Sequence, residues 1–429
     1  MSTTTTPHTQ TAYKDTPIGK IPADWEVKRL GEIIKGKGEY GINAPAVPYD
    51  KNLPKYIRIT DIDDEGNFST EKITSVICET ASDYSLKEGD ILFVRTGATT
   101  GKAYLYKKDD GELVFAGFLI RFKIDDKIAD KYFVWSYTKT TKYENWVRKV
   151  SQRSGQPGLN SNEYSSLLLP LPPLSEQKRI AEVLSTWDKA IQLTEQLIRQ
   201  KEQRKKWLMQ QLLTGMKRLK GFSGEWKECK LGSLGDTYTG LTGKSKEDFG
   251  KGKPYIPYLN VFNNSRIDIK NLDYVKITED DKQNKVKYGD IFFTVSSETP
   301  NEVGMASVIL DEVDELYLNS FCFGFRLFDF NTLIPEFSSY LLRADTFRAK
   351  IYKLSQGATR FNLSKNNLMK LSIILPSKEE QTAIAEVLQA ADKEIELLKA
   401  KAEKLKEQKK GLMQQLLTGK KRLNLNLQD

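Results

Sequence analysis

The sequence predicts an α+β fold in which two strand-rich globular segments alternate with two long helices. Three observations support this prediction. A block that begins at Glu176-Gln177 recurs at Glu380-Gln381, 204 residues later (380 − 176) and without a gap, which indicates a duplicated domain pair. Within each block, apolar residues alternate at spacings of three and four, as in a coiled coil. Outside the blocks, short β-branched and aromatic runs end at Gly, Asn or Asp, as strands do.

The chain begins with a polar stretch rich in Ser and Thr. This stretch lacks the apolar core of a signal peptide, so we expect residues 1–16 to be a disordered tail of a cytoplasmic protein. No apolar run in the sequence reaches the roughly 18–20 residues that a membrane helix needs.

Two globular segments are expected, over residues 17–173 and 219–375. Each begins with the pattern Trp-x-x-x-x-Leu-Gly, at Trp25 and at Trp226, and each later contains a Lys-x-Gly-Asp-Ile-x-Phe run. The two segments therefore resemble each other, although more loosely than the helical blocks do.

The repeated blocks predict helices over residues 174–218 and 376–422, and residues 423–429 form a short tail. Each helix would contain about 40 residues and measure roughly 60 Å at 1.5 Å per residue. Each block starts with a serine that suits an N-cap and ends with a glycine that suits a C-cap. These residues are Ser175, Ser377, Gly215 and Gly419.

Neither helix can bury its apolar seam alone, and the simplest partner is the other helix. If a pseudo-two-fold axis relates the two halves, the pair is an antiparallel coiled coil. Lys201, Lys205 and Lys409 interrupt the seam, so we expect its middle to be weakly packed. Two separate helices, each packed on its own globular segment, are the alternative.

Charge and composition favour a nucleic-acid partner and exclude several kinds of chemistry. The formal charge is +9 and the pI is about 9.0, which suits a polyanion, although a Lys-rich surface would give the same balance. The only histidine is His8, so the folded part lacks His-based acid–base catalysis and Ser-His-Asp triads. Cys78, Cys229 and Cys322 are scattered without a CxxC pair, so we expect no disulfide framework, no zinc site and no cofactor.

Two strings imitate ligand-binding motifs without their context. Residues 36–41 match a dinucleotide fingerprint, but Pro45 and Pro48 block the helix that should follow. Residues 97–102 resemble a phosphate-binding loop, but Ala103 stands where Ser or Thr should ligate magnesium. The Asn-Pro-Pro-Tyr/Phe string typical of adenine methyltransferases does not occur in the sequence. We therefore predict no catalytic residues.

The order of segments and their motifs resemble the DNA-specificity subunit of type I restriction–modification systems. The resemblance covers nearly the whole chain. It rests on the Glu-Gln helix starts, on the Leu-Met-Gln-Gln-Leu-Leu-Thr-Gly helix ends at residues 208–215 and 412–419, and on the Gly-Asp-Ile-Leu-Phe-Val-Arg-Thr-Gly run at residues 89–97. It implies that each globular segment is a target recognition domain for one half of a bipartite, asymmetric site in double-stranded DNA.

The same resemblance implies a set of partner subunits. Two modification subunits would carry adenine-N6 DNA methyltransferase activity, and restriction subunits would carry the ATP-dependent motor and nuclease. The paired helices would space the recognition domains and dock the modification subunits, and the chain itself would be non-catalytic. The predicted partner-binding residues lie at the ends of the helices. They are Glu176, Gln177, Leu208, Gln211, Glu380, Gln381, Leu412 and Gln415.

Two polar loops in each globular segment are predicted to contact DNA, because their side chains suit phosphates and base edges. Ordinary polar turns would have the same composition. The predicted DNA-binding residues are Arg95, Thr96, Thr99, Lys102, Gln152, Arg153, Gln156, Thr294, Ser296, Ser297, Gln356, Thr359 and Arg360. Arg153 and Arg360 could each pair with a guanine. Residues 295–302 are more acidic than the matching residues 95–102, which predicts that the two half-sites differ.

Two other classes of function stay open at this point. One is a self-contained nuclease or methyltransferase whose motifs have diverged. The other is a protein-interaction scaffold whose coiled coil binds other helices, with DNA binding incidental. DNA turnover by the isolated chain would favour the first class, and DNA binding that depends steeply on salt would count against the second.

Overall fold

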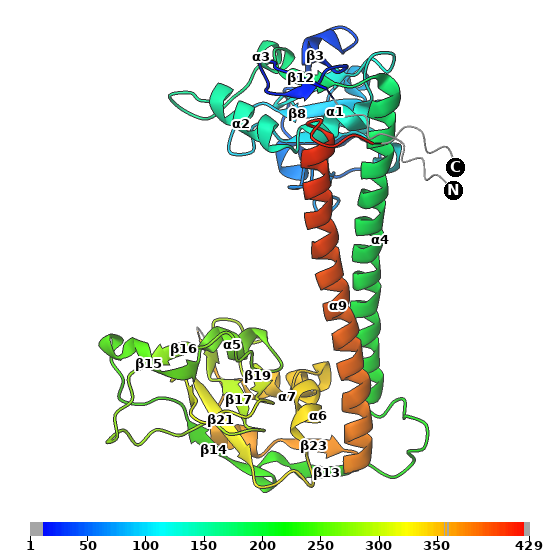
Figure 1. Ribbon diagram of the computed structural model, residues 1–429. Coiled ribbons are helices and arrows are strands. Elements are labelled where there is room, and N and C mark those ends of the chain that lie inside the picture. Colours follow the sequence, from blue (N-terminus) through cyan, green and yellow to red (C-terminus); the bar gives the residue numbers. More distant parts are fainter. Residues whose placement is uncertain (1–11, 356, 358–359, 424–429) are drawn as a thin grey trace, which may run out of the picture. The chain divides into compact units, whose positions relative to one another are not determined.

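Figure 1 shows the computed structural model of the chain, which describes residues 12–355, 357 and 360–423. The chain forms two compact units. Unit 1 contains Met1–Thr194 and Lys401–Asp429, and unit 2 contains Glu195–Ala400. The boundary falls inside both long helices, so each unit combines one globular domain with part of each helix.

The first globular domain is built around two small sheets, with strand orders β4-β11-β8-β9 and β10-β6-β7-β5. The strands of this domain are β1 (Tyr13–Lys14), β2 (Ile21–Pro22), β3 (Glu26–Arg29), β4 (Glu39–Tyr40), β5 (Val47–Pro48), β6 (Lys55–Ile57), β7 (Thr74–Ser75), β8 (Asp90–Val94), β9 (Ala103–Leu105), β10 (Leu113–Phe115), β11 (Leu119–Lys123) and β12 (Leu168–Leu171). Its helices are α1 (Lys131–Tyr137), α2 (Thr141–Val150) and α3 (Ser161–Ser165).

Strand β8 separates two hydrophobic cores, because successive side chains of a strand point to opposite faces. Ile91 and Phe93 belong to the core that α1 and the long helices cover. Leu92 and Val94 belong to a second core on the other face. All five residues of β8 are buried, so the hairpin that follows this strand starts from a rigid base.

The second globular domain repeats this plan. Its main sheet has the order β14-β21-β17-β19, and a smaller sheet has the order β16-β15-β20. The strands are β13 (Lys227–Lys230), β14 (Gly235–Thr239), β15 (Phe249–Ile256), β16 (Asp273–Val275), β17 (Ile291–Thr294), β18 (Ser296–Ser297), β19 (Ala306–Val308), β20 (Tyr317–Leu318), β21 (Cys322–Leu327), β22 (Phe361–Asn362) and β23 (Ser372–Leu375). The helices are α5 (Tyr258–Asn263), α6 (Pro335–Leu341), α7 (Asp345–Leu354) and α8 (Lys365–Met369).

The repeated Gly-Asp-Ile motif is structural in both domains. The carboxylate of Asp90 accepts the backbone N–H of Lys87 at 3.0 Å and lies 3.7 Å from the Arg121 guanidinium. Asp290 makes the matching contacts, to the Lys287 N–H at 2.8 Å and to Arg326 at 2.6 Å. The motif therefore joins the turn before the central strand to the strand beside it.

The long helices are α4 (Leu174–Leu212) and α9 (Lys378–Leu416), and they lie side by side (Figure 1). In unit 2, Lys201 of α4 pairs with Glu394 of α9 at 2.5 Å, and Lys205 pairs with Asp392. Residue numbers rise along α4 while they fall along α9, which confirms the antiparallel pairing and excludes two separate helices. Among the described residues, no helix is long and apolar enough to cross a bilayer.

The lysines that interrupt the apolar seam form ion pairs across it. In unit 1, Lys409 pairs with Asp188, whose carboxylate also accepts the hydroxyl of Tyr132 from the first domain. In unit 2, Lys205 pairs with Asp392, which accepts the hydroxyl of Tyr340 at 2.7 Å. Because the aspartates of these pairs are 38% and 37% exposed, each pair contributes on the order of 0.2–1 kcal/mol. The expected weak point of the seam is thus also where each domain contacts both helices.

Glu176 and Gln177 are buried, so we revise their predicted role as partner contacts. Glu176 accepts the indole N–H of Trp25 at 3.1 Å and two N–H groups of Arg422 at 2.6 Å. Gln177 accepts the backbone N–H of Asp130, at the start of α1, at 2.9 Å. These side chains attach the first domain to its helix.

Glu380 and Gln381 have the same buried role in unit 2, and they too cannot contact a partner directly. Glu380 accepts two N–H groups of Arg218 at 2.5 Å and the indole N–H of Trp226 at 3.3 Å. Gln381 accepts the backbone N–H of Ile334 at 3.1 Å, next to the start of α6. The repeated Trp and Glu-Gln motifs are therefore partners in one contact.

The helix caps differ in part from the prediction. Ser377 accepts the backbone N–H of Glu380 at 3.4 Å, as an N-cap does. Ser175 lies inside α4, because that helix already begins at Leu174. Gly215 and Gly419 lie just beyond the helix ends with φ of +72° and +71°, a conformation that glycine adopts without strain.

The predicted N-terminal tail differs over its last residues. Tyr13 and Lys14 form a strand that pairs with Ile21 and Pro22, so these residues belong to the folded domain. The Tyr13 hydroxyl also donates a hydrogen bond to the carbonyl of Gly419 at 3.0 Å. The polar composition of this segment reveals neither its pairing with β2 nor its contact with Gly419, which is why composition alone predicted a tail here. Residues 1–11 and 424–429 lie outside the described residues.

Candidate nucleic-acid interface

The two loops predicted to contact DNA in the first domain lie against each other. The carbonyl of Arg95 accepts the backbone N–H of Leu159 at 2.8 Å. Gly97 N donates to the carbonyl of Pro157 at 3.1 Å, and the Thr100 hydroxyl donates to the same carbonyl at 3.1 Å. The loop between β8 and β9 and the segment after α2 therefore form one polar surface.

The second domain brings its two loops together in the same way. The Val295 carbonyl accepts the backbone N–H of Leu363 at 2.9 Å, which matches the contact between Arg95 and Leu159. Strands β18 and β22 pair directly, with Ser296 opposite Asn362. The backbone framework of the loops is thus built twice, while the side chains differ.

The cationic side chains of the first hairpin loop are held in place. The Arg95 guanidinium lies 4.8 Å from the centroid of the Tyr40 ring, over its face. The Lys102 ammonium pairs with Asp64 at 2.6 Å, and this contact lowers the pKa of the Asp64 carboxyl. A DNA phosphate would have to replace Asp64 at Lys102. Thr96 and Thr99 of this loop are partly exposed.

Arg153 is also held by contacts within the chain. Its guanidinium donates to the carbonyls of Val150 and Gln152, both at 2.9 Å, and pairs with Glu163. A contact to guanine would require the guanidinium to leave Glu163. Its side chain is 41% exposed, and Gln152 and Gln156 are exposed beside it, so the segment is open to a ligand.

The structure corrects the prediction for Thr294, which cannot contact DNA. Thr294 is fully buried at the end of β17, and its hydroxyl accepts the backbone N–H of Met305 at 2.9 Å. Ser297 is also buried, and its hydroxyl donates to Glu302 at 3.2 Å while accepting the Thr299 N–H at 3.2 Å. Both hydroxyls stabilise the loop rather than face solvent.

The remaining predicted residues of the second domain are only partly described. Ser296 is partly exposed, and Arg360 is exposed. Gln356 and Thr359 lie outside the described residues. Within the part of the chain that the structure describes, no group of three or more His, Cys, Asp or Glu side chains could hold a metal ion.

Sequence reasoning missed an exposed phenylalanine beside each hairpin loop. The backbone N–H of Arg95 donates to the carbonyl of Phe118 at 3.0 Å, and that of Val295 donates to the carbonyl of Phe321 at 3.1 Å. The side chain of Phe118 is 59% exposed and that of Phe321 is 66% exposed. Each phenylalanine directly precedes a strand, β11 or β21, and this place in the sequence does not reveal its exposure.

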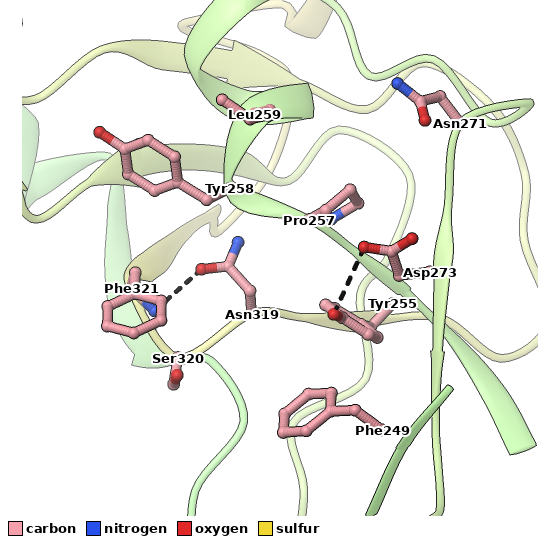
Figure 2. A pocket seen from close by; sticks show the side chains of 10 residues that line it. All are labelled: Phe249, Tyr255, Pro257, Tyr258, Leu259, Asn271, Asp273, Asn319, Ser320 and Phe321. Carbon is pink, nitrogen blue, oxygen red and sulfur yellow. Dashed lines mark hydrogen bonds between the residues drawn. The ribbon is translucent and has the colours of Figure 1, made fainter. Parts of the chain in front are cut away.

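In the second domain, Phe321 forms one wall of an aromatic groove (Figure 2). The groove is lined by Phe249, Tyr255, Pro257, Tyr258, Leu259, Asn271, Asp273, Asn319, Ser320 and Phe321. The Tyr258 hydroxyl donates to the carbonyl of Ser296 at 3.4 Å, so one residue that lines the groove also contacts the hairpin loop. An apolar, aromatic surface thus adjoins the polar loops.

The family model described as the type I restriction modification DNA specificity domain matches the chain twice, over residues 22–203 and 223–407. The chain belongs to this family. Each match spans one globular domain and most of the helix that follows it, so the family unit is the repeat seen in the sequence. The resemblance drawn from the helix motifs is therefore confirmed.

Several members of this family resemble the chain along its length. The MjaVIII specificity subunit of Methanocaldococcus jannaschii is 29% identical over an alignment 425 residues long, which covers 95% of each chain. The HsdS subunit of Thermoanaerobacter tengcongensis has a similar structure, with a TM-score of 0.51, 18% identity and 93% and 98% of the two chains covered. The S subunit of M. genitalium gives a TM-score of 0.55 and 15% identity, with 94% and 99% covered. These structures support the same fold.

Proposed function

We propose that the chain is the DNA-specificity subunit of a type I restriction–modification complex. In this proposal, each globular domain recognises one half of a bipartite, asymmetric site in double-stranded DNA. One observation carries the proposal: the same pair of loops is built twice on equivalent backbone hydrogen bonds, with different side chains. A duplicated framework with divergent contacts suits recognition of two different half-sites.

The proposal includes partner subunits that supply the chemistry. Two modification subunits methylate adenine at N6, restriction subunits supply ATP-dependent cleavage, and the chain itself catalyses neither step in the cytoplasm. The paired helices dock the modification subunits. Gln415 is exposed and Leu208, Gln211 and Leu412 are partly exposed, so these four side chains remain candidate contacts.

The proposal is tested by mapping DNA methylation. The chain is produced with its modification subunits in a host that lacks adenine methylation, and the methylated adenines are mapped across the genome. We expect a single motif with two different specified halves and a fixed unspecified gap. Methylation without a motif, or methylation that does not require this chain, would contradict the proposal. The isolated chain, incubated with DNA, magnesium and S-adenosylmethionine, should show no turnover.

We also propose that the paired helices set the gap between the half-sites. Lys201 and Glu394 face each other, so one heptad inserted beside each residue lengthens both helices in register. The insertion adds about 10.5 Å, at 1.5 Å per residue, which corresponds to about three base pairs of DNA. The control carries the same seven residues between Glu279 and Asp280, which are exposed. A methylated motif with an unchanged gap in the helix variant would refute the spacing role.

A further inference from the structure

Each globular domain holds one phenylalanine ring in solvent at an equivalent place. Phe118 and Phe321 are tied by their carbonyls to the first residue of the hairpin loop, Arg95 and Val295. Burying a phenylalanine is normally favourable, so rings that are 59% and 66% exposed represent unused apolar surface. The feature occurs in both halves of the repeat, although the residues around it differ.

The local backbone explains why neither ring can turn inward. Phe118 lies in a turn closed by the Leu119 N–H, which donates to the Ala116 carbonyl at 2.9 Å. Leu119 then begins β11 and is fully buried, so the preceding side chain points to the opposite side. Cys322 is likewise buried at the start of β21, and Phe321 precedes it. The ring is presented by the strand that follows it.

The surroundings of the two rings indicate what they contact. Beside Phe118 lie the polar hairpin loop and the pair formed by Arg95 and Tyr40. Beside Phe321 lie Tyr255 and Tyr258 in the groove of Figure 2. The first ring thus lies near a cationic side chain, whereas the second lies among aromatic rings and the amides of Asn271 and Asn319, with Asp273 as the acidic member of the groove. Aromatic rings suit nucleic acid because bases offer flat faces to stack on. The rings also adjoin the loops that we assign to DNA.

Resting on the proposed function, we propose that Phe118 and Phe321 are wedges that insert against a base step, one in each half-site. Apolar side chains that insert between base pairs unstack them and bend the duplex. Such a wedge adds sequence preference without a hydrogen bond, since pyrimidine–purine steps are the easiest to unstack. The wedges would thus contribute to specificity alongside the polar loops.

The test uses the complex of this chain with its modification subunits and duplexes that carry the methylated motif. 2-Aminopurine, which fluoresces more strongly when unstacked, replaces one base at a time in each half-site. We expect the wild-type complex to raise the fluorescence at one step in each half. Phe118→Ala should abolish the rise in one half only, and Phe321→Ala in the other half only. Each variant should also bind the site about 5- to 100-fold more weakly, the loss typical of a removed base–aromatic stack.

Phe328 provides a matched control for Phe321. It is 65% exposed, the same residue type, and follows the other end of β21. Phe328→Ala should leave both fluorescence and affinity unchanged. Equal effects of Phe321→Ala and Phe328→Ala on fluorescence and affinity would overturn the wedge proposal. It would also be overturned if Phe321→Ala bound DNA normally but no longer assembled with the modification subunits. None of these outcomes contradicts the proposed function as long as the wild-type complex methylates a motif. The proposed function itself fails if the wild-type complex methylates no motif.

Discussion

The hairpin loops of the two domains occupy the same place in the fold but present opposite charges. The first loop has Arg95 and Lys102, whereas the second has Glu298 and Glu302 at nearby positions. In both domains a backbone hydrogen bond of 2.8–2.9 Å ties the loop to the segment before the last short helix, α3 in the first domain and α8 in the second. Because the framework depends on main-chain atoms, the side chains can change without loss of the fold. The comparison separates what holds a domain together from what it recognises.

The largest expected effect breaks the shared framework at its buried carboxylates. Among the described residues, Arg218 keeps just the Gly224 carbonyl as an acceptor in Glu380→Ala. In Glu176→Ala, by contrast, Arg422 still pairs with Asp24. Removing one partner of a fully buried pair costs about 3–5 kcal/mol. Because the Arg218 side chain is 26% exposed, we expect Glu380→Ala to lose about 3 kcal/mol, the lower end of that range, and Glu176→Ala to lose less.

Urea unfolding of the purified chain measures this difference, with each unit followed by its own tryptophans. Glu176→Ala also serves as the matched control, because the two residues make the same indole contact. Equal losses in both variants would show that Asp24 does not compensate for the missing carboxylate.

The next effect concerns the glycines that follow the long helices. An added Cβ at Gly419 would lie 2.3 Å from Cδ of Pro22, whereas at Gly215 the nearest atom, in Trp226, is 3.4 Å away. Both positions have positive φ, which costs a residue with a Cβ about 1–2 kcal/mol. Gly419→Ala also overpacks against Pro22, so we expect it to lower the free energy of unfolding by about 2–4 kcal/mol. Gly215→Ala should lower it only by the cost of the positive φ, about 1–2 kcal/mol. Thermal unfolding of the two variants tests the order, and an equal loss would contradict it.

A third prediction separates the two half-sites. Arg153→Ala should relax the base preference in one half of the motif, and Arg360→Ala in the other half. A lost bidentate contact to guanine weakens discrimination by about 1–3 kcal/mol. Methylation mapping of the complex with each variant reads out the motif directly. Uniform weakening at all sequences would instead mark the arginine as a phosphate contact.

The smallest effect compares Lys139 with Arg343, which follow α1 and α6 at the same spacing. Burial and the charge of Lys409 lower the pKa of Lys139 to about 7, and burial lowers that of Arg343 to about 10. Above pH 7 the folded lysine is neutral while the unfolded one still binds a proton, so stability rises with pH. We expect a gain of about 1 kcal/mol between pH 7 and pH 8. In Lys139→Arg, the free energy of unfolding measured with denaturant should no longer rise between pH 7 and pH 8. If it rises as much as in the wild type, Lys139 is not the source of the pH dependence.

The fold was largely predictable from the sequence, because helix periodicity and an internal repeat are local patterns. The roles of the repeated Glu-Gln pairs were not, since the arginine partners of Glu176 and Glu380 lie 246 and 162 residues away along the chain. A glutamate at the start of a helix normally faces solvent. Only the folded chain brings an arginine and a tryptophan onto it.

The candidate interface was predictable in outline and less so in detail. Polar composition predicted both loops, but Thr294 is buried, because both faces of β17 are covered. In such a strand the side chains do not alternate between buried and exposed, so the sequence pattern does not indicate which residues face solvent. Phe118 and Phe321 were missed because hydrophobic residues are expected inside. Their exposure depends on the turn before a strand, which is a three-dimensional property.

The contact between Arg422 and Glu176 has a consequence for synthesis of the protein. The core of the first domain includes Met413, Leu416 and Leu417, which are translated only after all of unit 2. Between Thr194 and Lys401 the ribosome must first produce the whole of unit 2. At about 5–20 residues per second, this takes roughly 10–40 s, during which the first domain lacks part of its core. Its apolar surface is then open to chaperones, so translation rate becomes a variable in the yield of folded protein.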